Sequence, residues 1–120
     1  MILHGGSNLR IGGTLPASLV EISIFNNGKR YNTFDISKLV NLRKFGITNV
    51  VNILLGDNTN LKQIQIFDSK NVHISGALPQ SLEYVEARDT SFRHGEVLRV
   101  SKDTEVSLDG CKNVKVEKNY

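Results

Sequence analysis

The chain has 120 residues, of which 39% are hydrophobic and 22% are charged, so it predicts one folded domain over residues 1–120 and excludes a disordered segment. Its formal net charge is +3, and the basic residues are scattered rather than gathered into an aromatic-lined stripe, which argues against a nucleic-acid-binding surface. Aromatic residues are few and tryptophan is absent, so we expect a core of isoleucine, leucine and valine in narrow, stacked strands.

Signals for targeting, membrane insertion and covalent cross-linking are sparse. No basic segment followed by an apolar stretch opens the chain, and no apolar run approaches the roughly 20 residues of a membrane helix. We therefore expect a soluble chain without an ordinary signal peptide, either cytoplasmic or exported. Cys111 is the only cysteine, which excludes an intramolecular disulfide and a thiolate metal cluster.

The chain repeats itself. Residues 9–19 (LRIGGTLPASL) and residues 72–82 (VHISGALPQSL) are similar and lie 63 positions apart, which is three times 21. A period of about 21 residues indicates a solenoid, in which each coil buries its apolar face only against neighbouring coils. This architecture makes surface recognition the default function.

Each repeat predicts a short strand with one buried face, because apolar and polar residues alternate after a leading apolar residue. In chain order, the central apolar positions are 22, 45, 64, 85 and 106, separated by 23, 19, 21 and 21 residues. Met1-x-Leu3 begins a partial earlier rung, 21 residues before Ile22 and Ile24. The residues expected in the core are Leu19, Ile22, Ile24, Leu42, Phe45, Ile47, Leu61, Ile64, Ile66, Leu82, Val85, Val106 and Leu108.

A second apolar pair follows most of these strands and predicts a second strand on the opposite side of each coil. These pairs are Leu9/Ile11, Phe34/Ile36, Val51/Ile53, Val72/Ile74 and Val114/Val116. Such short coils leave little room for helix, and only residues 35–44 are compatible with a helical turn, capped by Asp35 or Ser37. The predicted fold is mostly β: a leucine-rich-repeat-like solenoid of five to six coils with parallel strands and little or no helix.

One position per coil is expected to turn inward between the two strands, five residues after the central apolar residue. It holds Asn27, Val50, Ser69, Thr90 and Cys111. Small polar groups at this position can bond backbone groups that a turning chain would otherwise bury without partners. Cys111 is therefore predicted to be a buried, hydrogen-bonded thiol rather than an activated nucleophile.

These features together resemble the leucine-rich-repeat pattern, Leu-x-x-Leu-x-Leu-x-x-(Asn/Cys), over essentially the whole chain. The segments Leu-Pro-Ala-Ser-Leu (15–19) and Leu-Pro-Gln-Ser-Leu (78–82) look like the short Leu-Pro-x-x-Leu repeats of bacterial secreted effectors, and are also similar to the FNIP repeats of amoebae and large viruses. The chain departs from these families because asparagine occupies the inward position only once and the FNIP tetrapeptide is absent. The resemblance supports the architecture and names no activity.

The outward residues of the first strands are expected to form ladders on one face, with adjacent rungs about 4.8 Å apart. Large apolar groups on a polar face, together with Tyr and Arg side chains, are typical of binding surfaces. The candidate partner-binding residues on this face are Phe25, Gln65, Phe67, Tyr84, Glu86 and Arg88.

The two phenylalanines of this face are predicted to lie two rungs, roughly 10 Å, apart with only Thr48 between them. That spacing would leave a slot for an apolar side chain of a partner, with Arg88 at its edge. The alternative is that both rings pack beneath the loops that follow their strands, in which case they contribute to packing and recognition lies elsewhere.

Other candidate chemistry is poorly supported. His73 and His94 are 21 residues apart, but a metal site needs a third ligand in register, so we expect solvent-facing histidines and no metal or cofactor. A set of carboxylates, at Glu86, Asp89, Glu105 and Asp109, resembles that of polysaccharide-cleaving parallel β-helices. A flat face gives neither a cleft nor the burial that a catalytic carboxylate pair needs, so we do not expect an enzyme.

Two glycines mark turns of the repeat. Gly13 aligns with Gly76, and both are expected to adopt a positive φ, where alanine would be strained. The glycine-rich segments near the N-terminus are therefore interpreted as turns rather than as phosphate-binding loops.

Three functions remain open at this point. The preferred one is a protein-binding repeat module that uses its first-strand face, with an unidentified protein as partner. The alternative is a structural or assembly segment, because solenoid ends expose apolar edges and associate end to end unless they are capped. A polysaccharide-active enzyme is the least supported of the three.

Overall fold

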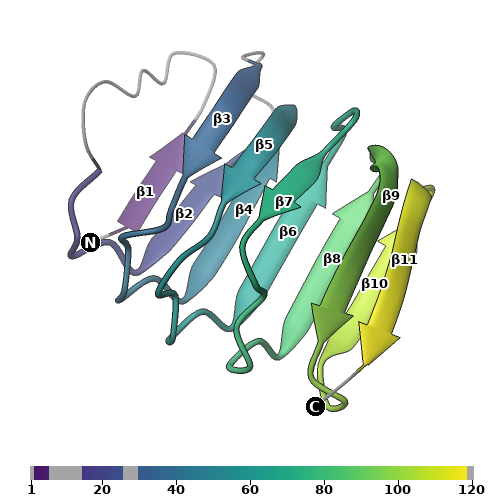
Figure 1. Ribbon diagram of the computed structural model, residues 1–120. Helices are drawn as coiled ribbons and strands as arrows, with labels where there is room; N and C mark the ends of the chain where they lie inside the picture. The colour runs from purple at the N-terminus through teal and green to yellow at the C-terminus, as the bar shows by residue number, and fades with distance from the viewer. Residues whose placement is uncertain (1, 6–14, 26–29, 119–120) are drawn as a thin grey trace.

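Parallel strands stack as a β-solenoid, which confirms the predicted fold class (Figure 1). The computed structural model describes residues 2–5, 15–25 and 30–118, and within these ranges it contains no helix. Accordingly, these ranges hold no helix long and apolar enough to cross a membrane. From residue 21 onward, each coil contributes one strand to a sheet on either side of a thin apolar core.

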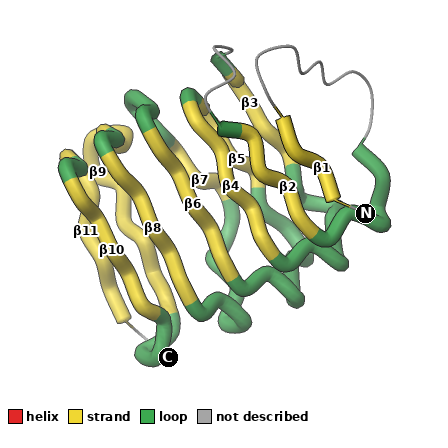
Figure 2. The backbone as a smooth tube through the Cα atoms, turned by 180° about the vertical axis from the view of Figure 1, so that it is seen from behind, coloured by secondary structure: helices red, strands yellow, loops and turns green. Residues whose placement is uncertain are grey.

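The first strands form one continuous six-stranded sheet, seen from its outer side in Figure 2. In spatial order they are β1 (Ile2–Gly5), β2 (Glu21–Ile24), β4 (Lys44–Thr48), β6 (Gln63–Phe67), β8 (Tyr84–Arg88) and β10 (Glu105–Asp109). The predicted central positions pair directly with one another, running from Ile22 through Phe45, Ile64 and Val85 to Val106. Leu3 pairs with Ile22, so the partial first rung is also confirmed.

The second strands lie on the other side of the solenoid and are divided between two sheets. One sheet has the order β3 (Tyr31–Asp35), β5 (Val50–Leu54) and β7 (His73–Ser75), and the other pairs β9 (Ser91–Val100) with β11 (Lys112–Lys118). An isolated bridge between Val72 and Phe92 joins them. The predicted pair Leu9/Ile11 lies outside the described residues.

Burial confirms the predicted core with one systematic exception. Leu19, Leu42, Leu61, Leu82 and the inward residues of β2, β4, β6 and β8 are buried. Val106 and Leu108 are only partly buried, because no later first strand covers β10 within the described residues. The prediction of full burial is therefore wrong for these two residues.

The second strands differ in detail from their predicted pairs. Val50, not Val51, points inward with Ile53, so the first member of that pair is corrected by one residue. The predicted pairs include none in the coil that contains β9. The buried apolar side chains of β9 are Phe92, Leu98 and Val100, and they are spaced irregularly because the β9–β11 register shifts between the Ser91–Lys112 and Glu96–Val114 pairs. An insertion of this kind breaks the 21-residue period.

A left-handed residue follows each first strand from β4 onward and turns the chain inward. It is Asn49 (φ 64°), Asp68 (φ 50°), Asp89 (φ 49°) and Gly110 (φ 69°). Asn, Asp and Gly are the residues that tolerate this conformation at least cost. In the sequence this column consists of Asn, Asp and Gly one position before the inward residue.

The predicted helical turn at residues 35–44 is absent, and tight turns take its place. The amide of Leu39 donates to the carbonyl of Ile36 (3.1 Å), and that of Leu42 donates to the carbonyl of Leu39 (3.2 Å). Asp35 does act as a cap, since its Oδ1 accepts the Ser37 amide at 2.9 Å and the Ser37 hydroxyl. These bonds from Ser37 lower the pKa of the Asp35 carboxyl. Each coil must return to the next strand within a few residues, so a helix has no room to continue.

Candidate partner-binding face

The outer ladders of the first sheet are those predicted. The first ladder pairs Glu21, Lys44, Gln63, Tyr84 and Glu105, and the second pairs Ser23, Gly46, Gln65, Glu86 and Ser107. Thr48, Phe67, Arg88 and Asp109 form the third, and Phe25 follows the last residue of β2. All six candidate residues therefore lie on one side of one sheet, which we call the outer face.

The two phenylalanine rings of the outer face are stacked on each other. The centroids of Phe25 and Phe67 are 5.4 Å apart, with an angle of 30° between the ring planes. The predicted separation of roughly 10 Å with a slot between the rings is therefore wrong. Both rings are half-buried and form one continuous apolar ridge.

Gly46 is the reason for this stack. It lies on β4, which is flanked by β2, the strand before Phe25, and by β6, the strand that contains Phe67. A Cβ atom built on Gly46 would collide with the ring of Phe25. Without a side chain at Gly46, the Phe25 ring leans across β4 until it meets Phe67. Thr48, expected to stand between the rings, is buried instead, and its hydroxyl has no hydrogen-bond partner among the described residues.

Charged and polar groups continue the ridge along β8. The guanidinium carbon of Arg88 lies 5.9 Å from the centroid of the Phe67 ring, within the range of a cation–π contact. Nε of Arg88 forms an ion pair with Oε2 of Glu86 at 2.8 Å, and Nε2 of Gln65 donates a hydrogen bond to Oε1 of the same carboxylate at 3.0 Å. The Glu86 side chain is only 7% exposed, so the cation of Arg88 and the amide of Gln65 compensate a carboxylate that would be costly to bury alone.

Tyr84 completes the outer face on the same strand. It is half-buried and lies two residues before Glu86, so both side chains leave β8 on the same side. Nearby, Nζ of the exposed Lys44 lies 4.0 Å from Oε1 of the half-buried Glu21. Such surface pairs contribute little to stability, so the ordered part of the face is the ridge and the Arg88–Glu86–Gln65 network.

The two histidines are not stacked, and only one of them faces solvent freely. His94 is exposed, next to Gly95 (φ 87°), within the residues that interrupt the β9–β11 register. His73 instead places Nδ1 2.9 Å from Oε2 of Glu96, a carboxylate that sequence reasoning missed. The irregular register of β9 puts Glu96 near the position that a strict 21-residue period assigns to His94.

The inward ladder is confirmed at Ser69 and Thr90. The Ser69 hydroxyl accepts the Val50 amide (3.1 Å) and donates to the Phe67 carbonyl (3.0 Å), and the Thr90 hydroxyl donates to the Arg88 carbonyl (2.8 Å). The Cys111 thiol donates to the carbonyl of Ala87 at 3.3 Å, as predicted, but it is only partly buried, so the prediction of a buried thiol is wrong. Burial is the main cause that raises the pKa of this thiol above its ordinary value. Asn27 lies outside the described residues.

The remaining candidates are the two turn glycines and the four carboxylates. Gly76 has the predicted positive φ, at 97°, and Gly13 lies outside the described residues. Among the four candidate carboxylates, Glu86 is held by Arg88, and the Asp89 amide donates to the carbonyl of Asp109 at 2.9 Å. No cluster of three or more metal-binding side chains occurs in the part of the chain that the structure describes.

Comparisons with known proteins add no family. The chain matches no protein-family model, and no curated protein or solved structure matches it.

Proposed function

We propose that this protein is a repeat module that binds another protein through the outer face. The observation that carries the proposal is the stack of Phe25, Phe67 and Arg88, with ring centroids 5.4 Å apart and the guanidinium 5.9 Å from the Phe67 centroid. The stack presents aromatic surface and a cation together on a flat parallel sheet. Aromatic and arginine side chains supply most hot spots of protein interfaces.

The local geometry supports recognition because the side chains are already ordered. Phe25 rests on Gly46, and the Nε of Arg88 is held by Glu86, so binding would immobilise few further rotamers. The Arg88 side chain is 60% exposed, which leaves the guanidinium open to a carboxylate of a partner.

The shape of the face determines what a partner must offer. The rings form a ridge and not a slot, so the partner supplies a flat or concave apolar surface that covers the ridge. A carboxylate beside that surface would reach Arg88 and exclude water from its contact with Phe67. Tyr84 lies on the same side of β8 and extends the contact area past Glu86.

A photo-crosslinking experiment tests this proposal. A photoreactive phenylalanine analogue at position 84 is expected to capture a partner in an extract of the source cell, whereas the same analogue at position 38, an exposed position in the turn between β3 and β4, is not. The partner identified in this way is then titrated with purified variants. R88A is expected to weaken binding at least about tenfold, as for a typical hot spot, and K62A, an exposed lysine outside the ridge, to leave it unchanged. Equal capture at both positions, or equal affinity of R88A and K62A, would contradict the proposal.

A second candidate function is end-to-end assembly, and the last coil favours it. Val106, Leu108, Val114 and Val116 are partly buried, whereas the inward residues of inner coils are buried almost completely. A second copy stacked on this end would cover them, as a further coil does inside the solenoid. Sedimentation velocity over a wide concentration range tests this: association that V116E abolishes supports stacking, and a monomer at every concentration contradicts it.

A further inference from the structure

The side of the solenoid opposite the outer face opens between β7 and β9. The two strands meet at the Val72–Phe92 bridge, where the Val72 amide donates to the Ser91 carbonyl (3.1 Å) and the Arg93 amide donates to the Val72 carbonyl (2.8 Å). Past this bridge the strands belong to separate sheets, although β6 and β8 in the same coils remain paired along their whole length. The two strand edges therefore diverge like a wedge.

Irregular pairing of β9 explains the wedge. β9 pairs with β11 at an offset of 21 residues at Ser91–Lys112 (112 − 91) but of 18 at Glu96–Val114 (114 − 96), so three extra residues of β9 lie between these pairs. Glu96 then reaches back across the gap, and its Oε1 accepts the amide of Ile74 at 3.2 Å. A side-chain carboxylate thus replaces the backbone carbonyl that a paired strand would offer to Ile74.

Beyond Glu96, one amide at the edge of the gap has lost its partner. In the two preceding coils, the Ile36 amide donates to the Leu54 carbonyl (3.0 Å) and the Leu55 amide donates to the Ser75 carbonyl (2.8 Å). Gly76 is the next member of this column, and its amide donates to no acceptor within the described part of the chain. Gly76 also has no side chain where Ile36 and Leu55 bury an aliphatic one.

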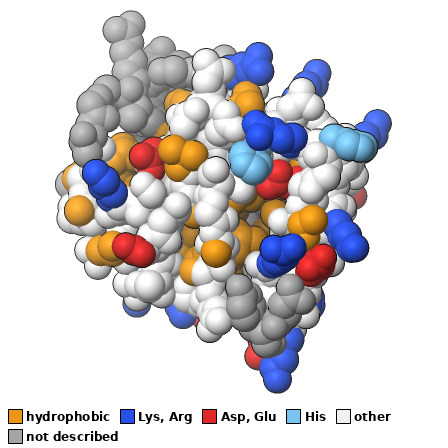
Figure 3. Space-filling view, viewed as in Figure 1, with side chains coloured by type: hydrophobic (Ala, Val, Ile, Leu, Met, Phe, Trp, Pro, Cys, Tyr) orange, Lys and Arg blue, Asp and Glu red, His pale blue; other side chains and the backbone are white. Residues whose placement is uncertain are grey.

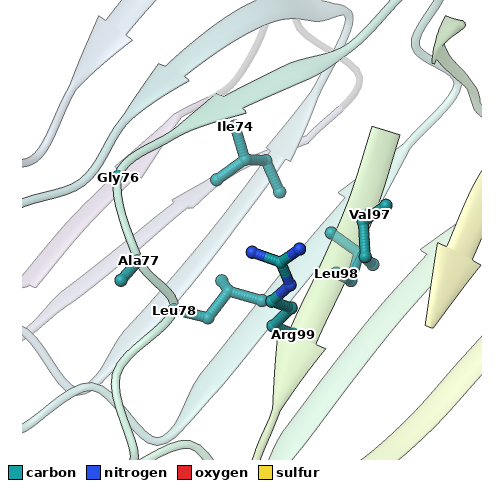
Figure 4. A pocket seen from close by; sticks show the side chains of 7 residues that line it. All are labelled: Ile74, Gly76, Ala77, Leu78, Val97, Leu98 and Arg99. Atoms are coloured by element: carbon teal, nitrogen blue, oxygen red, sulfur yellow. The ribbon is translucent and has the colours of Figure 1, made fainter. Parts of the chain in front are cut away.

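A cavity of about 230 Å³ occupies the gap. Figure 4 shows its apolar walls, formed by Ile74 and Leu78 on one side and Val97 and Leu98 on the other. In the space-filling view, the middle of this side is hollowed and has hydrophobic side chains at its floor (Figure 3). The cavity is smaller than the roughly 300–1,000 Å³ of pockets that hold drug-sized ligands, so it suits a single aliphatic side chain.

A positively charged side chain, that of Arg99, also lines the cavity. Figure 4 shows the terminal nitrogens of Arg99 pointing into the gap, toward Ile74 and away from β9. The Nε atom of Arg99 donates to Oε2 of Glu117 at 3.4 Å, and the side chain is 67% exposed. A guanidinium beside apolar walls matches a ligand that carries a carboxylate next to an aliphatic group.

We propose that this cavity binds the free C-terminus of an extended peptide from another protein, with an aliphatic last residue. The aliphatic side chain lies between Ile74, Leu78 and Leu98, and the terminal carboxylate accepts hydrogen bonds from Arg99. A backbone carbonyl of the peptide accepts the amide of Gly76, so the peptide adds a short strand at the edge that β9 leaves open. Capture of a terminal carboxylate and addition of a strand to a sheet edge are both established modes of peptide recognition.

This inference is independent of the proposed function, because the cavity and the outer face lie on opposite sides of the solenoid. A peptide terminus is preferred over a free fatty or amino acid because the Ile36 and Leu55 amides of the same column donate to backbone carbonyls of a neighbouring strand. The Gly76 amide is therefore placed for the backbone of an added strand, which a free fatty or amino acid does not have. The requirement for both groups makes the site selective for a chain end.

Fluorescence anisotropy with a labelled peptide of sequence Ser-Thr-Val-Thr-Val tests the proposal on the whole chain. The peptide with a free terminal carboxylate is expected to bind at least about tenfold more tightly than the same peptide with a terminal amide, the difference expected for a charge-assisted pair. R99Q is expected to remove this preference. R93Q, an arginine of the same strand that contacts Asn52 instead, is the matched control and should keep it.

NMR chemical shifts of the wild-type protein locate the site without relying on a variant. Addition of the peptide is expected to move the Gly76 amide and the Arg99 Nε signals before those of the outer face. Equal binding of the carboxylate and amide peptides, an unchanged preference in R99Q, or shifts confined to other residues would overturn the proposal. Binding of free isovalerate as tightly as the peptide would also overturn it, since the site would then recognise a small carboxylate rather than a chain end.

Discussion

At the scale of single residues, the buried polar side-chain atoms of the described residues have hydrogen-bond partners, with the exception of one hydroxyl. Ser69 and Thr90 bond the backbone where each coil turns inward, and Asn58 does the same at the opposite turn, donating to the Ile36 carbonyl at 2.7 Å. The hydroxyl of Thr48 is buried beneath the aromatic ridge and has no partner among the described residues. Each satisfied group stabilises the turn that it bonds, whereas the Thr48 hydroxyl carries a desolvation cost.

We therefore expect T48V to raise the free energy of unfolding by about 1–2 kcal/mol, because valine keeps the shape of threonine and removes the unpaired hydroxyl. Urea denaturation of the variant and the wild type measures the difference. S69A is the control, since it removes a hydroxyl that is bonded at both ends and should lower stability by about 1–3 kcal/mol. Loss of stability in T48V comparable to that in S69A would show that the Thr48 hydroxyl is bonded.

Cys111 provides a second prediction, from its ionisation. Burial raises the pKa of the thiol, and the carboxylates of Asp89 and Asp109 act in the same direction, so less thiolate is present at neutral pH than in an unconstrained cysteine. Alkylation by iodoacetamide at pH 7 should be several-fold slower in the folded protein than in urea. The midpoint of the rate against pH should also be higher in the folded protein, and coincident midpoints would contradict this explanation.

At the scale of elements, the first strands are more regular than the second ones. The spacings of 23 and 19 residues around β4 sum to two periods of 21, so β6 returns to register and the six-stranded sheet is continuous. The second strands tolerate the three extra residues of β9 only by separating into two sheets. Gaps and binding sites are therefore expected on the second-strand side, and flat ladders on the first.

The middle of the stack is where a core substitution should cost most. Ile64 is 1% exposed and is paired with Phe45 on one side and Val85 on the other. I64A should lower the free energy of unfolding by roughly 2–5 kcal/mol, because paired strands on both sides prevent the core from collapsing around the space. Chemical denaturation measures this loss.

The valines of the same column provide a matched comparison for that prediction. Val85 is buried between strands, whereas Val106 is partly buried on the last first strand. V85A should therefore cost clearly more stability than V106A, although both remove the same two methyl groups. Equal losses would indicate that burial along the stack does not decide the cost.

At the scale of the whole molecule, a solenoid is stabilised by contacts between neighbouring coils. The coils that contain β4 and β6 have neighbours on both sides, and the coil with β10 and β11 has a described neighbour on one side. Among the described residues, no further strand pairs with the outer edge of β10 or β11. Stability is expected to be highest in the middle and to fall toward the last coil.

Hydrogen exchange measures this gradient directly. Amides of β6 should exchange most slowly. Among the strands from β6 to β11, those of the last coil, β10 and β11, should exchange fastest, because opening this coil breaks contacts with one neighbouring coil only. If a second copy covers the end coil, protection of β10 and β11 should rise with protein concentration. Uniform protection at low concentration would show that the solenoid unfolds as one cooperative unit.

The sequence by itself determined the architecture and the first-strand ladders. In a parallel stack without a shift in register, a residue and its counterpart one period later become direct neighbours, so the 21-residue period and the alternation of apolar residues predicted that Ile64 lies beside Val85 and Gln65 beside Glu86. The inward hydroxyls at Ser69 and Thr90 followed from the same period, because one inward position recurs in each coil.

Only the tertiary structure decided in which direction side chains lean across neighbouring strands and at which residues the 21-residue period is interrupted. Phe25 reaches Phe67 because Gly46 leaves space across an intervening strand, and the ladder spacing does not encode the direction in which a ring leans. Glu96 meets His73, and Arg99 enters an open cavity, because β9 contains extra residues whose position is set by pairing with β11. The repeat period predicts only what all coils have in common. Both candidate sites lie where one coil differs from its neighbours, at Gly46 and at the extra residues of β9, and their geometry depends on how the surrounding side chains and strands pack around that difference.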